Sequence, residues 1–411
     1  MDKQQMAIVG GGMVGSILAL LLARFVPQTH ITLLDKQPTT TATQRPSFDG
    51  RSTAIAPTTV DCFKQLGLWP QLQGGVTPIA KIHISDRGHA GLGLFDGDDN
   101  HGEPLGYVVE NARLGPVLMQ ALANEPTIST IAGEATQLHF NGQGAELCWQ
   151  TIHQDQAVGD IARALFNVVL VCDGAASPLR QRLGIGAKTV DYQQHALVAN
   201  VRHSLAHNSQ AYERFTARGP LALLPRGGHA GARESTVVWT CPNAELADIQ
   251  SMSAAERLSA LQAQFGYRLG LFTEMSEPVF YPLELVIAQE QVRSRLVLMG
   301  NAAHFLHPVA GQGFNLAVRD CLRLVETFKS AAARNQDLGA LALLQDYAKA
   351  QYADQRNTIG MSHGFNRVFT RAPLPMQLLR TAGFLALELN PFMREQFIGL
   401  LSGRAQGQVR L

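Results

Sequence analysis

The segment Met6-Ala-Ile-Val-Gly-Gly-Gly-Met-Val-Gly15 decides the fold of this chain. Its apolar start predicts a short strand, and the residues from Val14 to about Phe25 predict a helix. Between them Gly10, Gly12 and Gly15 stand at the spacing Gly-x-Gly-x-x-Gly. In a dinucleotide-binding turn the first glycine allows the tight turn, the second lets a pyrophosphate approach the backbone, and the third lets helix and strand pack closely. The spacing alone is a weak signal, so its context decides.

The context is a complete strand-helix-strand unit over about residues 4 to 35. A second strand, His30-Ile-Thr-Leu-Leu-Asp35, ends in an acid twenty residues after Gly15, where such folds bind a ribose hydroxyl. An acid at this position repels a 2′-phosphate, so the nucleotide held here is not expected to be NADP. A glycine-rich turn without a ligand is the alternative. The chain has one such glycine motif, which predicts one firmly bound nucleotide. Any second nucleotide is expected to bind only transiently.

A second buried strand is predicted at Phe166-Asn-Val-Val-Leu-Val-Cys172, because a continuous apolar run is typical of a parallel strand covered on both faces. The run ends in Asp173 and Gly174. Ser177 follows without a Gly-x-Ser-x-Gly elbow, which argues against hydrolase chemistry. We expect Ser177 and Arg180 to cap and pin the helix after Asp173.

A third stretch, Gly300-Asn-Ala-Ala-His-Phe-Leu-His-Pro-Val-Ala-Gly-Gln-Gly-Phe-Asn-Leu-Ala-Val-Arg-Asp320, runs from a strand end through a loop into an apolar helix from about Phe314. A loop of this kind presents unpaired backbone N–H groups at the helix start to an anion. His304 and His307 are its titratable candidates for a catalytic base, although loop histidines bonded to the backbone are the favoured interpretation. A metal pair is not indicated, because no third ligand is suggested nearby.

At 411 residues the chain can form two or more hydrophobic cores, and 46% hydrophobic with 16% charged residues excludes a disordered protein. Lys and Arg total 34 against 33 Asp and Glu, so no nucleic-acid partner is indicated. The five cysteines form no Cys-x-x-Cys pair, which favours a reducing, cytoplasmic setting. The uncharged run from Ala7 to Ala23 contains the motif glycines, so we interpret it as strand plus helix and expect no transmembrane segment.

These patterns predict an α/β fold, with a Rossmann-like nucleotide-binding domain, an inserted, mainly antiparallel sheet and C-terminal helices. The insertion shows period-two patterning, as in Ala196–Val201 and Thr236–Thr240, and one polar helix near Ser253–Phe265. We expect a discontinuous nucleotide-binding domain over residues 1–75, 105–184 and 285–335, a substrate domain over 76–104 and 185–284, and a C-terminal helical segment over 336–411.

The three motifs, in this order over roughly residues 4 to 330, resemble the FAD-dependent aromatic hydroxylases of the para-hydroxybenzoate hydroxylase type. The stretch from Gly300 to Asp320 is most similar to the ubiquinone-biosynthesis branch of that family. Phe48-Asp-Gly-Arg-Ser-Thr-Ala54 and Ser85-Asp-Arg-Gly-His-Ala-Gly91 are similar to members that hydroxylate 2-octaprenyl-6-methoxyphenol. The resemblance therefore implies FAD as the firmly held nucleotide.

The resemblance also implies a role for each motif residue in holding FAD. It implies that the pyrophosphate is held by Gly10, Gly12 and Gly15, and the adenosine ribose by Asp35. Arg51 and Arg113 would contact the phosphates or the adenine side, and Asp173 and Gly174 would order the cofactor from their strand end. The ribityl and pyrophosphate portion would meet Gly300 and Asn301, and the isoalloxazine would lie against Pro308, Gly311, Gln312 and Gly313. Asn301 departs from the family, which usually has Asp there. Asn keeps an acceptor oxygen but loses the charge.

The isoalloxazine assignment has physical support of its own. Reduced flavin carries negative charge near N1, and a helix N-terminus offers roughly half a positive charge with unpaired N–H donors. The predicted helix from Phe314 is apolar on one face, with Leu316, Leu324 and Phe328, so it can anchor the loop.

The resemblance implies a monooxygenase whose chemistry is the flavin's own. NAD(P)H would reduce FAD, O₂ would add as a hydroperoxide at C4a, and an electron-rich prenylated phenol would attack its distal oxygen. The protein must exclude water and help ionise the phenol. The alternatives are a sister ubiquinone-ring hydroxylase, a hydroxylase of soluble aromatics, an NAD-dependent dehydrogenase, and a non-catalytic flavin-binding member of a biosynthetic complex.

The C-terminal segment from Phe365 to Leu401 mixes large apolar residues with arginines, and the chain ends soon after it. Its arginines, with one just beyond it, are Arg367, Arg371, Arg380, Arg394 and Arg404. Helices packed on the FAD domain are the favoured interpretation. The alternative is an apolar path for a prenyl tail or a basic surface for anionic lipid, which would make the protein peripherally membrane-associated.

Overall fold

The computed structural model describes residues 4–37, 51–87, 92–100, 102–153, 156–307, 311–369, 390–404 and 411. The predicted contact residue Pro308 lies outside these residues, as do residues 48–50 and 88–91 of the two shorter motifs. Arg371 and Arg380 of the C-terminal segment lie outside them as well.

The N-terminal strand-helix-strand unit forms the centre of the first sheet. It consists of β1 (Gln4–Val9), α1 (Met13–Phe25) and β2 (Thr29–Asp35), as the sequence predicted. β1 pairs in parallel with β2 on one side and with β11 (Val168–Val171) on the other. Two segments far apart in the sequence are therefore neighbours in the middle of the sheet.

The first sheet has eight strands in the order β10-β9-β8-β2-β1-β11-β19-β18. Its other strands are β8 (Ile128–Phe140), β9 (Ala145–His153), β10 (Gln156–Phe166), β18 (Val292–Arg293) and β19 (Leu296–Leu298). Val168 and Leu170 join the apolar cluster on one face of β11, whereas Val169 and Val171 join a different cluster. β11 is therefore buried on both faces, as predicted.

The apolar run from Phe166 to Cys172 is not one strand, which corrects the prediction. Phe166 ends the antiparallel strand β10, and the chain turns at Asn167 before β11 begins. The Asn167 side chain accepts a hydrogen bond from the backbone N–H of Gln5 at 2.7 Å, and its own N–H donates to Gln5 O at 2.8 Å. Apolar residues flank this turn on both sides, so the sequence pattern does not reveal it.

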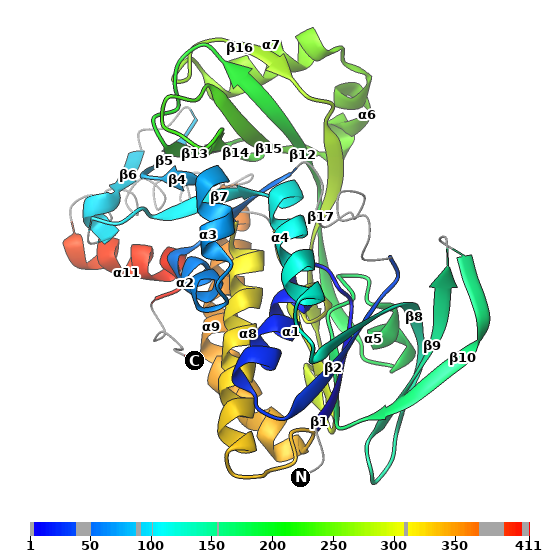
Figure 1. Cartoon of the computed structure of the whole chain (residues 1–411). Helices are drawn as coiled ribbons and strands as arrows, with labels where there is room; N and C mark the ends of the chain where they lie inside the picture. The colour runs from blue at the N-terminus through cyan, green and yellow to red at the C-terminus, as the bar shows by residue number, and fades with distance from the viewer. Residues whose placement is uncertain are drawn as a thin grey trace.

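The antiparallel extension formed by β8, β9 and β10 was not predicted. Figure 1 shows these strands reaching away from the body of the molecule. Much of β8 is exposed or half-buried, with no regular alternation of buried and exposed positions. A strand without that alternation leaves no period-two signal in the sequence.

The second sheet is mainly antiparallel, as predicted, with the order β20-β17-β12-β15-β14-β13-β5-β6 and with β16 paired to β12. Its strands are β5 (Lys81–Asp86), β6 (Leu92–Asp96), β12 (Ala187–His203), β13 (Gln210–Thr216), β14 (Gly219–Arg226), β15 (Glu234–Pro242), β16 (Phe272–Met275), β17 (Val279–Ala288) and β20 (His304–Phe305). The pair of β13 with β5 is parallel.

Two helices, α6 (Asn243–Ser251) and α7 (Ala254–Phe265), cover one face of this sheet at the top of Figure 1. The sequence predicted one. α7 has a clear signature, because Ser253 and Glu256 form a capping box at its start. α6 buries only Ile249, so its amphipathic pattern is weak.

The remaining elements are a small sheet, seven helices and three short 3₁₀ turns among the described residues. A small sheet has the order β3-β7-β4, with β3 (Ser52–Ile55), β4 (Thr77–Ile79) and β7 (Gly106–Glu110). The helices are α2 (Pro57–Gln65), α3 (Trp69–Leu72), α4 (Asn111–Ala123), α5 (Pro178–Arg182), α8 (Gln312–Ala332), α9 (Leu341–Phe369) and α11 (Pro391–Ser402), and the short 3₁₀ turns are η3 (Gln73–Gly75), η4 (Gly97–Asn100) and η5 (Gly300–Ala302). The domain boundaries given above remain predictions.

The two C-terminal helices lie against different parts of the molecule. α9 runs beside α8, where Arg319 Nε donates to Asp354 Oδ2 at 2.7 Å. α11 packs on the second sheet, since Ile398 joins a cluster with Phe95 and Phe215. Its last turn also contacts the predicted FAD domain, because Thr58 Oγ1 of α2 donates a hydrogen bond to Ser402 O at 3.2 Å.

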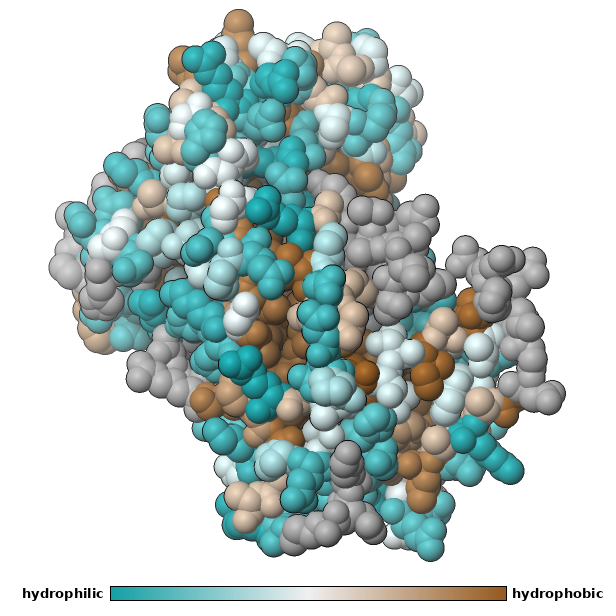
Figure 2. Space-filling view, viewed as in Figure 1, coloured by the Kyte–Doolittle hydropathy of each residue, from teal (hydrophilic) through white to brown (hydrophobic). Residues whose placement is uncertain are grey.

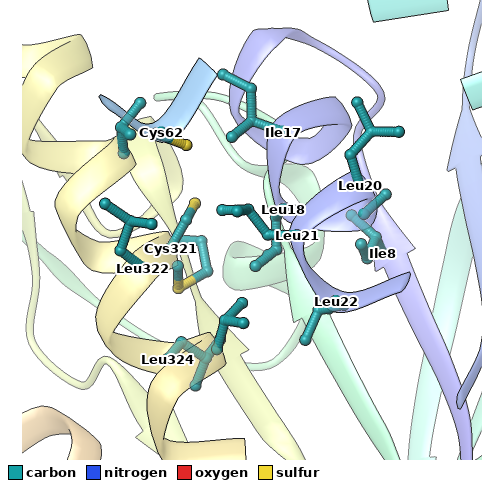
Figure 3. Packing of buried hydrophobic residues seen from close by; sticks show 14 of the residues in the cluster. Ile8, Ile17, Leu18, Leu20, Leu21, Leu22, Cys62, Cys321, Leu322 and Leu324 are labelled. Carbon is teal, nitrogen blue, oxygen red and sulfur yellow. The ribbon is translucent and has the colours of Figure 1, made fainter. Parts of the chain in front are cut away.

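The largest apolar cluster lies between α1 and α8. Figure 3 shows Leu18 and Leu21 of α1 facing Cys321 and Leu324 of α8, with Cys62 of α2 beside them. Burial raises the pKa of the Cys62 thiol to about 12, so it stays protonated and packs as an apolar group. This cluster fixes α8 against the glycine-turn helix.

The surface in Figure 2 is mostly hydrophilic over the end that carries α6 and α7, and apolar residues gather near the middle of the view. Within the described helices, none combines the length and the hydropathy that a membrane crossing requires.

We predict that Leu18→Ala lowers the free energy of unfolding by about 2–5 kcal/mol, because Leu18 is fully buried between α1 and α8. Guanidinium unfolding followed by circular dichroism measures the change. Leu205→Ala is the control, since Leu205 is 53% exposed and its truncation should cost about 0.5 kcal/mol or less. Equal effects of the two substitutions would contradict the assigned role of the α1–α8 contact.

Candidate functional site

The glycine turn between β1 and α1 brings three backbone segments into close contact. Gly10 has φ +104°, and a Cβ on it would stand 2.4 Å from the carbonyl oxygen of Cys172. A Cβ on Gly15 would stand 1.9 Å from the carbonyl oxygen of Gly10. Gly12 is the N-cap of α1 and, having no side chain, leaves the N–H groups of the first turn uncapped. Gly10 and Gly15 therefore require glycine for the tight turn and the close packing that the motif predicted.

Asp35 lies beside this turn. Its Oδ2 accepts a hydrogen bond from Gly11 N at 2.5 Å, and its Oδ1 accepts one from Gln37 N at 2.9 Å. The acid at the end of β2 thus stands next to the N-terminus of α1, where the sequence placed it.

Asp173 follows β11 and reaches the same turn from the other side. Its Oδ2 accepts a hydrogen bond from Leu179 N at 3.3 Å, and burial raises the pKa of its carboxyl above the ordinary value. In the described part of the chain, its buried Oδ1 has no hydrogen-bond partner. Gly174 follows with φ +98°. A buried acceptor without a donor is costly, so this oxygen is suited to a ligand hydroxyl.

Ser177 and Arg180 have the structural roles predicted for them. The Ser177 side chain caps α5 by accepting a hydrogen bond from Arg180 N at 3.2 Å. Arg180 Nη1 donates to Ala302 O at 2.8 Å, and its Nη2 donates to Ala175 O at 3.0 Å. Arg180 therefore joins the end of β11 to the loop that begins at Gly300.

The Gly300 loop lies across the first turn of α1. Gly300 has φ +56°, and a Cβ on it would stand 3.1 Å from Cγ1 of Val14. Asn301, which the sequence predicted to meet the cofactor, is exposed. The glycine turn, the end of β11 and this loop therefore meet at the carboxyl ends of the parallel strands of the first sheet.

The start of α8 is fixed to the chain before α2. Gly311 is the N-cap of α8 in the left-handed conformation, with φ +61°. A Cβ on Gly311 would stand 3.2 Å from the Cβ of Ala54. Gln312 is buried, and Gly313 has room around its Cα. Gly311 therefore fits the close approach that the motif predicted.

Asn315 holds this junction with four hydrogen bonds. Its Oδ1 accepts from Ala56 N at 2.7 Å and from Thr59 Oγ1 at 2.8 Å. Its Nδ2 donates to Ala54 O at 3.0 Å and to Gly311 O at 2.9 Å. Sequence reasoning gave Asn315 no role, although a polar residue on the apolar face of a predicted helix is a signal for one.

His304 and His307 are placed differently from the prediction that both bond to the backbone. The ring of His304 bonds to a carboxylate instead: its Nε2 lies 2.5 Å from Asp320 Oδ2, and Gln355 Nε2 donates to Asp320 Oδ1 at 3.0 Å. Neither ring nitrogen of His307 has a hydrogen-bond partner among the described residues, and its ring packs edge-on against Tyr192 at 5.3 Å. Burial lowers the pKa of His307 to about 4, so it is neutral near pH 7.

The two predicted arginines contact Tyr281 and Gly75, respectively. The Arg51 guanidinium lies 4.6 Å from the ring centroid of Tyr281 on the second sheet. The Arg113 guanidinium lies against Gly75, where a Cβ would stand 2.1 Å from its Cζ. Among the described residues, no group of three His, Cys, Asp or Glu side chains could hold a metal ion.

This convergence of a glycine turn, an acid, two uncapped helix starts and an unpaired buried acceptor defines a dinucleotide site in a Rossmann-like fold. Residues 3–351 match the model of the family described as "FAD binding domain", so the chain belongs to that family. It is an FAD-dependent monooxygenase of the para-hydroxybenzoate hydroxylase type.

Within this family the chain belongs to the ubiquinone-biosynthesis hydroxylase branch, which confirms the resemblance found in the sequence. Ubiquinone hydroxylase UbiL of Rhodospirillum rubrum is 32% identical, over 98% of this chain and 90% of its own length. The 3-demethoxyubiquinol 3-hydroxylase of Escherichia coli is 29% identical, over 95% of this chain and 96% of its own.

The fold is also that of p-nitrophenol 4-monooxygenase PnpA from Pseudomonas putida DLL-E4, with a TM-score of 0.77, 16% identity and full coverage of both chains. At that identity the likeness concerns the fold alone. These matches do not support the alternative of an NAD-dependent dehydrogenase.

The residues present fit FAD. The glycine turn has no Cβ that would block a pyrophosphate, and the starts of α1 and α8 have no side-chain cap and no acid in their first turns. Asp173 Oδ1 offers a buried acceptor to a cofactor hydroxyl.

We predict that Asn315→Ala weakens FAD retention and lowers the free energy of unfolding by about 1–3 kcal/mol, because it leaves buried backbone groups of Ala54, Ala56 and Gly311 without partners. Flavin absorbance after gel filtration and the unfolding midpoint measure both effects. Asn124→Ala is the control, because Asn124 is exposed and bonds only Gln120 through its side chain. A variant of Asn315 with normal flavin content and stability would contradict its role.

Proposed function

We propose that this protein hydroxylates the aromatic ring of a polyprenylated phenol, of the 2-octaprenyl-6-methoxyphenol type, in ubiquinone biosynthesis. NAD(P)H is the electron donor and O₂ the co-substrate. The observation that carries the proposal is the convergence of the three motifs on one FAD site in a chain whose relatives include ubiquinone hydroxylases. A sister ring hydroxylase is the nearest alternative, because one relative is named for 3-demethoxyubiquinol.

In this proposal FAD is held by the predicted residues. Gly10, Gly12 and Gly15 hold the pyrophosphate, and Asp35 the adenosine ribose. The complete set adds Arg51 and Arg113 on the phosphate or adenine side, Asp173 and Gly174 at the strand end, Gly300 and Asn301 on the ribityl portion, and Pro308, Gly311, Gln312 and Gly313 against the isoalloxazine.

When bound, FAD supplies electron transfer from NAD(P)H and oxygen transfer to the ring. The chain's own contribution is to orient both partners and to exclude water. The start of α8, uncapped and anchored by Asn315, offers its N–H groups to the negative charge of reduced flavin. Buried His307 is neutral near pH 7 and adds no positive charge there.

The prenyl tail has a matching surface at α11. Phe392 is 67% exposed, Met393 is 44% exposed, and Leu94 of β6 is 41% exposed. Arg394 Nη2 of the same helix donates to Leu94 O at 2.5 Å, so α11 lies beside β6, and we call these three exposed apolar residues the α11 patch (Leu94, Phe392 and Met393). We place the protein in the cytoplasm, with this patch in contact with the membrane that holds the prenylated substrate.

The function is tested by expressing the protein in cells that lack their own hydroxylase for 2-octaprenyl-6-methoxyphenol. We expect the accumulated methoxyphenol to disappear and ubiquinone to return, as measured by mass spectrometry. A yellow, FAD-loaded protein with the intermediate unchanged would contradict the substrate. FAD binding without NAD(P)H oxidation stimulated by any prenylated phenol would favour the non-catalytic member of a biosynthetic complex.

We predict that the double variant Phe392→Ser, Met393→Ser binds phospholipid vesicles about tenfold more weakly, because two exposed apolar side chains are lost. Vesicle co-sedimentation measures this binding. Tyr267→Ser is the control, since Tyr267 is 71% exposed and lies beyond α7, away from α11. Equal vesicle binding by both variants and the unchanged protein would contradict the role of the α11 patch.

A further inference from the structure

The second sheet has one covered face and one face turned toward the flavin side. Tyr212 of β13 packs with Trp239 and Phe265 in the cluster under α7. Its neighbours Ala211 and Phe215 join different clusters, on the opposite side of the strand. Because side chains alternate along a strand, Glu213 lies on the same face as Ala211 and Phe215.

Glu213 begins a row of side chains that runs across the middle of this face. It stands opposite Ala222 of β14, which stands opposite Val238 of β15, which stands opposite Val198 of β12. All four side chains are only half-buried, although they occupy central strands. The other described residues therefore leave this row of side chains partly uncovered. We call it the open row (Glu213, Ala222, Val238 and Val198).

The open row adjoins the residues proposed to hold the flavin. Leu224 lies two residues beyond Ala222 on the same face of β14, and it packs in the cluster that contains Ala54. A Cβ on Gly311 would stand 3.2 Å from the Cβ of Ala54, so Ala54 lies directly against Gly311. On β15, Thr236 Oγ1 donates to Ser52 Oγ at 3.0 Å, which ties the same face to β3. By strand geometry, Glu213 and Leu224 are diagonal neighbours about 7–8 Å apart.

The carboxyl of Glu213 has no hydrogen bond or ion pair with any described residue. Burial raises its pKa to about 8, so most of it is protonated near pH 7. Its partners across the strands are the apolar Ala222 and Ile84. An ionisable group in apolar surroundings, partly accessible and without a protein partner, is suited to bind a polar group of a ligand.

Three arginines around Glu213 have partners elsewhere. Arg214, its neighbour in the strand, points to the covered face, where its Nε donates to Gln264 O. Asp86 stands opposite Phe215, two positions along β5 from Ile84. At the far end of β14, Arg226 pairs with Glu110 at 2.8 Å. On the α11 side, the Arg394 guanidinium lies 4.9 Å from the ring centroid of Phe95.

We propose that Glu213 is the catalytic residue that binds the phenol hydroxyl of the substrate and accepts its proton, with the aromatic ring lying on the open row. The inference rests on the proposed function and names the base that sequence analysis sought at His304 and His307. The phenol O–H bond breaks, its electron pair stays on the oxygen, and the proton forms an O–H bond on the carboxylate. The electron-rich ring is then ready to receive oxygen. When the hydroxylated ring regains aromaticity, its C–H bond breaks, the electron pair stays in the ring and this proton passes to water, while Glu213 returns its own proton to the phenol oxygen.

A base with a pKa near the working pH is suited to this step, because a more acidic carboxylate would accept the proton of a phenol much less readily. The apolar residues along the row, Ala222, Val238 and Val198, match the ring itself. Phe215 on the same face packs in one cluster with Phe95 of β6 and Ile398 of α11. The row therefore leads toward the α11 patch proposed for the prenyl tail.

The test compares the FAD-loaded protein with Glu213→Gln, which keeps the shape of the side chain and removes its titration. With the unchanged protein, kcat/KM for hydroxylation should rise with pH through about 8, because only the ionised carboxylate accepts a proton. Glu213→Gln should lose about a hundredfold or more of kcat, lose this pH limb, and keep its FAD absorbance. Glu274→Gln, an exposed residue paired with Arg202 on the same sheet, is the matched control.

Two further measurements keep the inference open to refutation. Glu213→Asp should retain the pH limb with a smaller loss of kcat, which covers the case in which Glu213→Gln fails to fold. Binding of 2-methoxyphenol, followed by the change in flavin absorbance, should weaken tenfold or more in Glu213→Gln and be unchanged in Glu274→Gln. Glu213→Gln with normal turnover, the same pH profile and normal 2-methoxyphenol binding would overturn the assignment.

The same probe separates the two proposals. If the protein binds 2-methoxyphenol through Glu213 but does not restore ubiquinone in cells, the substrate proposal fails and the assignment of Glu213 stands. If ubiquinone returns equally with Glu213→Gln, the substrate proposal stands and the assignment of Glu213 fails.

Discussion

The structure depends on the close approach of three backbone segments at the end of β1. Gly10 and Gly15 have no Cβ, so α1 can lie directly against the turn and the turn directly against Cys172 at the end of β11. A side chain at either position would push the helix away from the sheet, because the atoms it would meet belong to the backbone and cannot rotate aside. The sheet order, the position of Asp173 and the reach of Arg180 to the Gly300 loop all follow from this contact.

α8 transmits that arrangement to the rest of the molecule. Its apolar face packs on α1, while its first turn is held to the chain before α2 by Asn315. Farther along the helix, Asp320 receives hydrogen bonds from His304 and Gln355, and Arg319 pairs with Asp354. One helix thus connects the glycine turn, the flavin loop and α9, so the loop is positioned by buried contacts on several sides.

The sequence predicts the parts of the site that depend on local spacing. Gly10 and Asp35 are recognisable because the turn, the helix and the next strand occupy fixed offsets. Ser177 is recognisable as a cap because a cap bonds within its own helix. Asn315, by contrast, bonds to residues more than 250 positions away, and the offset between them has no physical rule.

Glu213 escapes sequence analysis for a different reason. Alternation in a strand separates its two faces, but it does not show which face a neighbouring domain leaves uncovered. That information exists only when β13, β14, β15 and β12 stand side by side. The turn at Asn167 and the irregular strand β8 were missed because burial along them does not follow a period.

The order of strands in the first sheet also bears on how the chain is made. Val9 pairs beside Val171, and Val171 pairs beside Leu298, so the centre of the sheet is complete only after most of the protein has been synthesised. At roughly 5–20 residues per second, the ribosome needs about 15–60 s to reach that last strand. Until β19 has been made, the apolar edge of β11 has no permanent neighbour on one side, and an open edge of this kind recruits other chains. A protein with this topology is therefore most exposed to aggregation during its synthesis, before β19 pairs with β11.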